Sequence, residues 1–203
     1  MWNRNIETFL GCDCSYEDSH IVIFGAPFDS TTSYRPGTRF ASRTMRAESY
    51  GLETYSPYQD LDLEEACVFD GGDLELPFGD TERALDMIRM YTREILQGGK
   101  LPLLIGGEHL VSLPAIEAAA NMYPELSIIH FDAHTDLREE YLGNRFSHAT
   151  VINLVMDVFT SLVYAVVRAQ SGNGHAQDIQ TSTPLLLQDF PRQLQQLQDA
   201  LSI

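Results

Sequence analysis

The chain has 203 residues, and its 29 acidic side chains outnumber its 13 basic ones, which gives a formal net charge of −16 at pH 7. Nucleic-acid binding requires a basic face, which this composition argues against, whereas negative charge can steer a small cationic molecule toward a site. The longest apolar run, near residues 158–167, is far shorter than the roughly 20 residues needed to span a bilayer. No charged and then apolar leader opens the sequence. We therefore expect a cytoplasmic protein with no nucleic-acid or membrane partner.

The three cysteines of the chain cannot all pair with one another. Cys12 and Cys14 are separated by one residue, whereas zinc and redox pairs use two. We expect all three cysteines to be ordinary thiols.

Strand and helix signals alternate from the start of the chain. A strand is expected over residues 21–24, followed by a loop rich in Ser, Thr and Pro over 25–37 and a helix over 39–50. A short strand over 68–69 leads into the sequence DGGD at 70–73, where flanking glycines favour a turn held by Asx hydrogen bonds.

The alternation continues with a helix that Asp80 or Thr81 caps and that ends near Gln97, with apolar residues at helical spacing on one face. A strand over 101–105 and an Ala-rich helix over 110–120 follow. Strands separated by helices imply right-handed crossovers and a mostly parallel sheet, so the fold class is α/β.

Histidine and aspartate residues gather where two expected strands end. His109 follows the strand over 101–105 and two glycines, and an apolar run over 126–129 leads to Asp132, His134 and Asp136. In an extended segment these last three side chains share one face and converge. Mixed carboxylate and imidazole ligands suit manganese, zinc or iron, and ligands bind at the carboxyl ends of parallel strands. The pattern predicts a dinuclear metal site bridged by Asp132; the plainer alternative is a solvated acidic strand end.

Other polar residues near these motifs have smaller expected roles. His148, after Ser147, is a candidate for catalysis, although a Ser-His pair is also common in surface loops. His130 is interpreted as a residue that packs or supports the ligands, and Glu108 is expected to face away from His109 and support it indirectly.

These motifs resemble the ureohydrolases, the family of arginase, agmatinase and formimidoylglutamase. GGEH at 106–109 is similar to the family's first metal motif, DAHTD at 132–136 to its second, and His148 to its proton-shuttle histidine. The segment 25–46 resembles agmatinases more than arginases, and the resemblance covers roughly residues 15–152.

The resemblance implies a three-layer arginase-like fold with a mostly parallel sheet, incomplete at the C-terminus. It also implies two manganese ions, one held by His109, Asp132 and Asp136, the other held in part by Asp132 and His134. The implied reaction is the hydrolysis of agmatine to urea and putrescine, a step of polyamine biosynthesis, with His148 relaying a proton to the leaving amine. The implied partner is a small cationic guanidino substrate, and the family forms homo-oligomers.

The sequence departs from the family pattern after about residue 152. The family's third metal motif, SxDxDxxDP, is absent, as is a counterpart of the late glutamate that pairs with the guanidinium. Gln occurs twice in residues 1–150 and eight times in 151–203. We expect residues 1–152 to be the N-terminal part of a ureohydrolase domain and 153–203 to be a divergent tail that packs poorly after about residue 170. Three functions stay open: an agmatinase-like hydrolase, an inactive fragment of one, or a hydrolase of a related guanidino acid or formimidoylglutamate.

Overall fold

A computed structural model describes residues 7–158 and 164–167 of the chain. The chain forms two compact units. The first consists of Met1–Pro124 and Asp136–Val158, and the second of Glu125–Thr135 and Phe159–Ile203. Residues after about 170, which we expect to pack poorly, lie outside the described residues.

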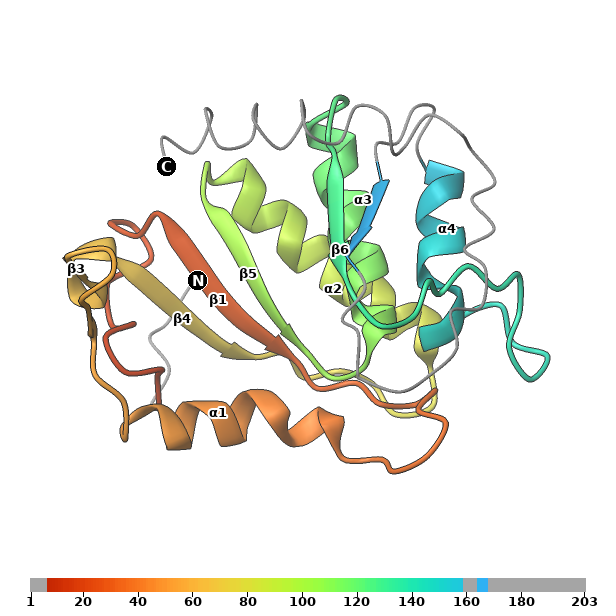
Figure 1. The fold of residues 1–203 in the computed structure, drawn as a ribbon, viewed down its shortest axis with the longest axis horizontal. Coiled ribbons are helices and arrows are strands. Elements are labelled where there is room, and N and C mark those ends of the chain that lie inside the picture. Colours follow the sequence, from red (N-terminus) through yellow and green to blue (C-terminus); the bar gives the residue numbers. More distant parts are fainter. Residues whose placement is uncertain (1–6, 159–163, 168–203) are drawn as a thin grey trace. The chain divides into compact units, whose positions relative to one another are not determined.

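A three-stranded sheet forms the centre of the first unit (Figure 1). Its strand order is β4-β1-β5, and β1 pairs in parallel with both neighbours. The parallel sheet predicted from the alternation of elements is therefore confirmed. The strands are β1 Ile21–Ala26, β4 Val68–Asp73 and β5 Leu101–Gly106.

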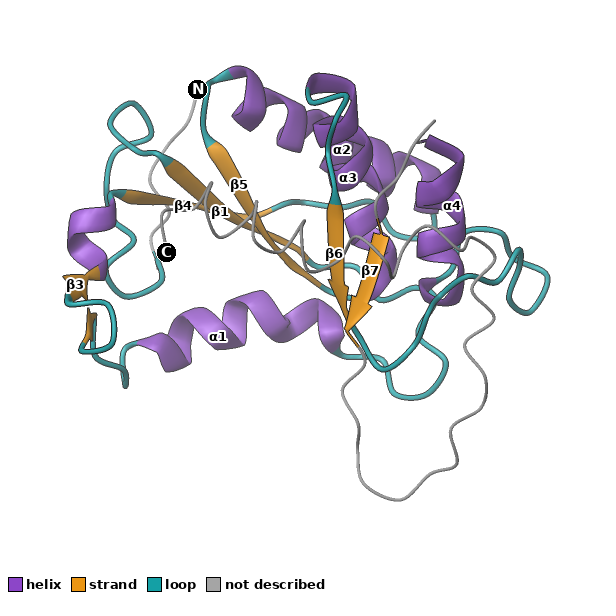
Figure 2. Cartoon of the chain, turned by 45° about the horizontal axis from the view of Figure 1, so that its top comes forward, coloured by secondary structure: helices purple, strands orange, loops and turns teal. Residues whose placement is uncertain are grey.

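Helices cover both faces of this sheet. In Figures 1 and 2, α1 lies on one side of the sheet, and α2 and α3 lie on the other. The Asp80 side chain accepts a hydrogen bond from Arg83 N, so the predicted cap of α2 is confirmed. A fourth helix, α4, packs against α3. The helices are α1 Ala41–Ser49, α2 Thr81–Gln97, α3 Ser112–Met122 and α4 Val151–Val158.

The central strand β1 is buried on both faces, as expected for a parallel sheet. Val22 and Phe24 pack with Phe69 and Ile95 in one cluster. Ile23, which points the opposite way, packs in a second cluster with Val68 and Cys12. Alternate residues of one short strand therefore fill two separate layers of the core.

Short elements complete the described chain. Four 3-10 helices are η1 Thr38–Phe40, η2 Leu63–Ala66, η3 His109–Val111 and η4 His148–Thr150, and β2 Tyr55–Ser56 pairs antiparallel with β3 Leu61–Asp62. In the second unit, β6 Ile128–Phe131 pairs in parallel with β7 Tyr164–Val167. Within the described residues, no helix is both long and apolar enough to cross a bilayer.

The DGGD sequence continues a strand, so the turn predicted there is wrong. β4 runs to Asp73, and Asp70 accepts from Gly72 N at 2.9 Å while also binding Arg46. The expected Asx hydrogen bond is thus present inside a strand. Gly72 has φ +75°, and the pairing with β1 shifts register between Ile23–Asp70 and Gly25–Asp73, so the strand is irregular at these glycines.

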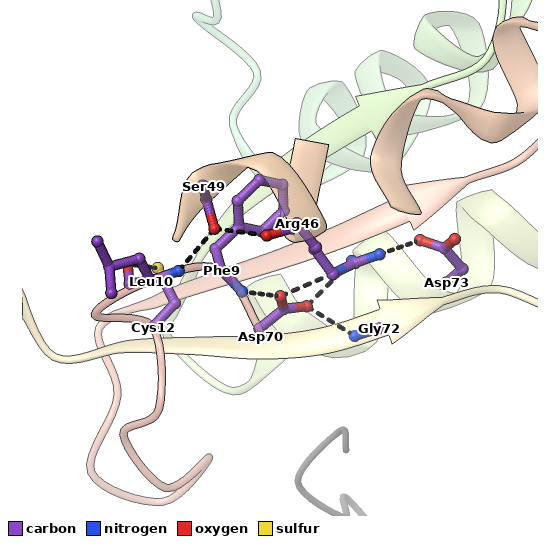
Figure 3. A network of polar contacts seen from close by, with 8 residues as sticks. All are labelled: Phe9, Leu10, Cys12, Arg46, Ser49, Asp70, Gly72 and Asp73. Carbon is purple, nitrogen blue, oxygen red and sulfur yellow. Dashed lines mark hydrogen bonds and ion pairs between the residues drawn. The ribbon is translucent and has the colours of Figure 1, made fainter. Parts of the chain in front are cut away.

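Arg46 of α1 is at the centre of a buried ionic network (Figure 3). Its Nε and Nη2 donate to the two Asp70 oxygens at 2.8 and 3.0 Å, and its Nη1 donates to Asp73 Oδ1 at 2.5 Å. Phe9 N and Gly72 N also donate to Asp70, each at 2.9 Å. Burial lowers the Arg46 pKa, but the hydrogen bonds to Asp70 and Asp73 outweigh it, and the net shift is upward.

Two of the three cysteines form a disulfide, so the prediction of three thiols is wrong. Cys14 and Cys67 are bonded, with a Cα–Cα distance of 5.2 Å. The spacing of Cys12 and Cys14 in sequence gave no sign of a partner that lies 53 residues beyond Cys14. Cys12 remains a free, buried thiol, and burial, with the nearby Asp70 and Asp13 carboxylates, raises its pKa to about 11. That thiol therefore stays protonated and unreactive at neutral pH.

We predict that replacing Arg46 with Met costs about 4 kcal/mol of unfolding free energy, because it leaves the Asp70 carboxylate buried and without its cation. Arg145→Met is the matched control. Its ion pair with Asp157 leaves both side chains more than 60% exposed (65% and 63%), so the cost should be below about 1 kcal/mol. Urea unfolding curves measure both, and equal losses in the two variants would contradict the importance of burial.

We predict that reduction of Cys14–Cys67 lowers the urea midpoint of unfolding. Closing a loop with a separation of 53 residues is worth about 4 kcal/mol in the chain-entropy estimate. Cys14→Ser should remove the dependence on dithiothreitol, whereas Cys12→Ser should keep it. A wild-type midpoint that does not respond to the reductant would show that the bond contributes nothing.

Candidate metal centre

His109 begins η3, after Gly107 and Glu108, which follow the end of β5 at Gly106. Gly107 N donates to Ala26 O at 3.0 Å, and Glu108 N donates to Phe28 O at 2.8 Å. A Cβ on Gly107 would lie only 1.7 Å from Phe28 O, so only glycine permits this approach of two backbones. The backbone leading to His109 is thereby fixed against the end of β1.

Asp136 has a left-handed backbone, with φ +47°. Its carbonyl accepts from Ile152 N at 3.0 Å and from Asn153 N at 3.3 Å. These N–H groups belong to the first turn of α4, and N–H groups in the first turn of a helix have no acceptor within that helix. The start of α4 therefore stabilises an unusual conformation at Asp136 and orients its side chain.

His109 and Asp136 meet in the first unit. His109 Nδ1 lies 2.6 Å from Asp136 Oδ2, and both side chains are largely buried. One imidazole nitrogen and one carboxylate oxygen thus point at the same place, although 27 residues separate them in sequence.

The second unit holds the remaining candidates around Asp132. Asp132 Oδ1 accepts from His134 N at 2.8 Å, and His134 Nδ1 lies 3.4 Å from the same oxygen. On the other side, His130 Nε2 lies 3.3 Å from Asp132 Oδ2. His130, interpreted from the sequence as a packing or supporting residue, is therefore a direct neighbour of a predicted ligand.

The extended segment predicted for residues 132–136 is wrong. β6 ends at Phe131. The Asp132 side chain then accepts the His134 N–H in a local turn, and Asp136 is left-handed. Strand alternation therefore does not orient Asp132, His134 and Asp136.

His148 begins η4 and is constrained on several sides. Ser147 caps η4 in a capping box with Thr150. The His148 ring lies edge-on to Tyr141 at 5.3 Å between centroids, and its Nδ1 lies 3.3 Å from Ser147 Oγ. The candidate relay is therefore part of a well-connected turn.

The pattern of the arginase family matches residues 19–184. This chain belongs to the arginase family. The match extends beyond residue 152, where we place the end of the ureohydrolase-like part, and that boundary stays a prediction.

Agmatinases are among the curated relatives of this chain. The agmatinase of Bacillus anthracis is 53% identical over 152 residues, which is 75% of this chain and 52% of the relative. That of Bacillus subtilis is 51% identical over 146 residues, 72% of this chain and 50% of the relative. The chain spans about half the length of these relatives.

Solved structures share the fold. The agmatine ureohydrolase of Thermoplasma volcanium has a TM-score of 0.73 and 26% identity, covering 81% of this chain and 62% of its own. A Clostridium difficile protein, provisionally described as an agmatinase, has a TM-score of 0.71 and 52% identity, covering 74% of this chain and 55% of its own. The arginase-like α/β fold predicted from the sequence is confirmed.

Proposed function

We propose that this chain belongs to an agmatinase-like ureohydrolase, which hydrolyses the guanidinium group of agmatine to give urea and putrescine. The observation that carries the proposal is the 53% identity with the Bacillus anthracis agmatinase over 75% of this chain. The contacts around His109, Asp132 and His148 support it, because they have the chemistry that such a reaction needs.

The donor set fits a divalent metal. His109 with Asp136, and Asp132 with His130 and His134, each combine imidazole nitrogens with carboxylate oxygens within 2.6 to 3.4 Å. Such mixed ligands suit manganese, zinc or iron, and carboxylates favour the harder ions. We propose manganese, with His109, Asp132, His134 and Asp136 as ligands.

When bound, a pair of divalent ions would lower the pKa of water and so supply hydroxide at neutral pH. That help is needed because resonance makes the guanidinium carbon a poor electrophile. The net charge of −16 favours the approach of a cationic substrate.

His148 would relay a proton to the leaving amine. An imidazole is suited to this role because its ordinary pKa lies close to neutral pH. The ring is held by Tyr141 and Ser147, so it presents a defined nitrogen rather than a freely rotating one.

Two further hypotheses depend on specific observations. The N(1)-aminopropylagmatine ureohydrolase of Thermococcus kodakarensis is 35% identical over 144 residues, which keeps a larger guanidino substrate open. The 203 residues contain no SxDxDxxDP motif, which favours an inactive chain when these residues are tested alone.

We also propose that the protein assembles as a homo-oligomer.

A cytoplasmic location stays a prediction. Disulfides are rare in that compartment, so the Cys14–Cys67 bond does not favour it.

We predict that the 203-residue chain binds at most one Mn²⁺ tightly, because the four candidate ligands do not complete two sites. Asp132→Asn should weaken binding by more than about tenfold, as losses around metal ligands generally do. Asp157→Asn is the control, since this exposed carboxylate pairs with Arg145. Isothermal titration calorimetry showing two equally tight sites would contradict the prediction.

We predict that the 203-residue chain with Mn²⁺ releases little or no urea from agmatine. A fusion to the corresponding C-terminal third of the Bacillus anthracis agmatinase should be active. It should lose activity on His134→Ala, and His148→Ala should slow it by about 10²- to 10⁴-fold, the usual contribution of acid–base catalysis. His20→Ala, at an exposed histidine, should change nothing. Rapid urea release by the 203-residue chain alone would overturn the first expectation.

A further inference from the structure

Thr31 connects three distant segments of the first unit. Its N and its Oγ1 both donate to Glu108 Oε1, at 2.9 and 2.5 Å. His148 N in turn donates to Thr31 Oγ1 at 3.0 Å. One threonine of the loop after β1 therefore links the residue before His109 with the backbone of His148.

The Thr31 hydroxyl has a fixed polarity in this link. A hydroxyl has one hydrogen to donate, and here the hydrogen goes to a carboxylate oxygen, so the His148 N–H must meet a lone pair. The hydrogen bond to the carboxylate oxygen is short, at 2.5 Å, and it polarises the hydroxyl toward better acceptance. The two hydrogen bonds of the side chain thus reinforce one another.

The side chain of Glu108 interacts with Thr31 and is otherwise unpaired among the described residues. The residue is 7% exposed, and among the described residues its second oxygen, Oε2, has no hydrogen-bond partner. Burying a carboxylate costs free energy, so a buried carboxylate in a native structure usually has an identifiable structural or functional role. Within the described part of the chain, the Glu108 side chain accepts hydrogen bonds only from Thr31. The sequence predicted that Glu108 supports His109 indirectly. In the structure its side chain supports Thr31 instead.

His148 needs an external partner for its backbone. It is the first residue of η4, and the first N–H groups of a helix have no acceptor within the helix. The Ser147 side chain accepts from Ala149 N rather than from His148 N. Thr31 therefore supplies the acceptor that the capping residue does not.

We propose that Thr31, held by Glu108, is a positioning residue that fixes the backbone of His148 and thereby the direction of its imidazole. The inference deepens the proposed function, because it rests on His148 as the proton relay. It adds a mechanical coupling: the backbone that presents the predicted ligand His109 and the backbone that presents His148 share one threonine.

The test uses three variants of the metal-free 203-residue chain and NMR of its histidines. Thr31→Val keeps the shape but removes the hydroxyl, Thr31→Ser restores it, and Thr32→Val removes a neighbouring hydroxyl that donates to Asp29 O instead. In Thr31→Val the amide hydrogen of His148 should exchange with solvent about tenfold faster, because the loss of an ordinary hydrogen bond is worth about that factor. The His148 ring signals should shift. Thr31→Ser and Thr32→Val should resemble the wild type.

Unchanged amide exchange and ring signals in Thr31→Val would overturn the proposal, as would equal changes in Thr32→Val. If Thr31→Val does not fold, Glu108→Gln replaces it. The amide weakens the acceptor for Thr31, so His148 exchange should rise there too, and no rise would equally overturn the proposal.

Kinetics of the active fusion separate this inference from the proposed function. Thr31→Val should lower kcat and alter its pH profile with KM unchanged, and Thr31→Ser should restore both. A fusion that releases no urea, with the NMR changes present, would reject the ureohydrolase function and leave the positioning link standing. Urea release with unchanged NMR signals would support the ureohydrolase function and reject the positioning link.

Discussion

The parallel pairing of β1 with both β4 and β5 is the constraint on which the first unit depends. It buries alternate residues of β1 in two separate clusters, and it brings the ends of β1 and β5 to one edge, with Ala26 paired to Gly106. The loops that leave these ends must then run together. Gly107 packs against the backbone of Phe28 there, and the chain continues from these two residues to His109 and Thr31.

Two buried carboxylates of the first unit, Asp70 and Glu108, differ in how their hydrogen bonds and charge are satisfied. Asp70 is surrounded by donors from Arg46, Phe9 and Gly72, so its charge is neutralised and its contribution is to hold α1 and the N-terminal segment on β4. Among the described residues, Glu108 forms no ion pair, and its Oε2 has no hydrogen-bond partner. A fully satisfied network stabilises a fold, whereas a buried carboxylate with an unsatisfied oxygen calls for an explanation of its own.

Local signals predicted most of the first unit, because they act over a few residues. The Asp80 cap and the apolar spacing after it located α2, and the run at residues 21–24 located β1. The disulfide and the left-handed Asp136 were not predictable in this way. Cys67 lies 53 residues from Cys14, and the partner of the Asp136 carbonyl is the start of α4. Motifs identified the residue types of the site, but strand alternation could not orient them. Nothing in its local sequence marks Thr31 as a positioning residue, although it lies within the segment 25–46 that resembles agmatinases.

The short stretch from Ser147 to Asn153 therefore has more influence on the site than its length suggests. Its first residues place the candidate relay His148, and its helical N–H groups fix the backbone of Asp136. A helix start has several unpaired donors, and here they are divided between a hydroxyl and a carbonyl from different parts of the chain. Because both acceptors belong to residues next to or within the predicted site, the relay and one ligand depend on the same turn. Coupling of this kind keeps catalytic groups correctly placed relative to one another without a direct contact between them.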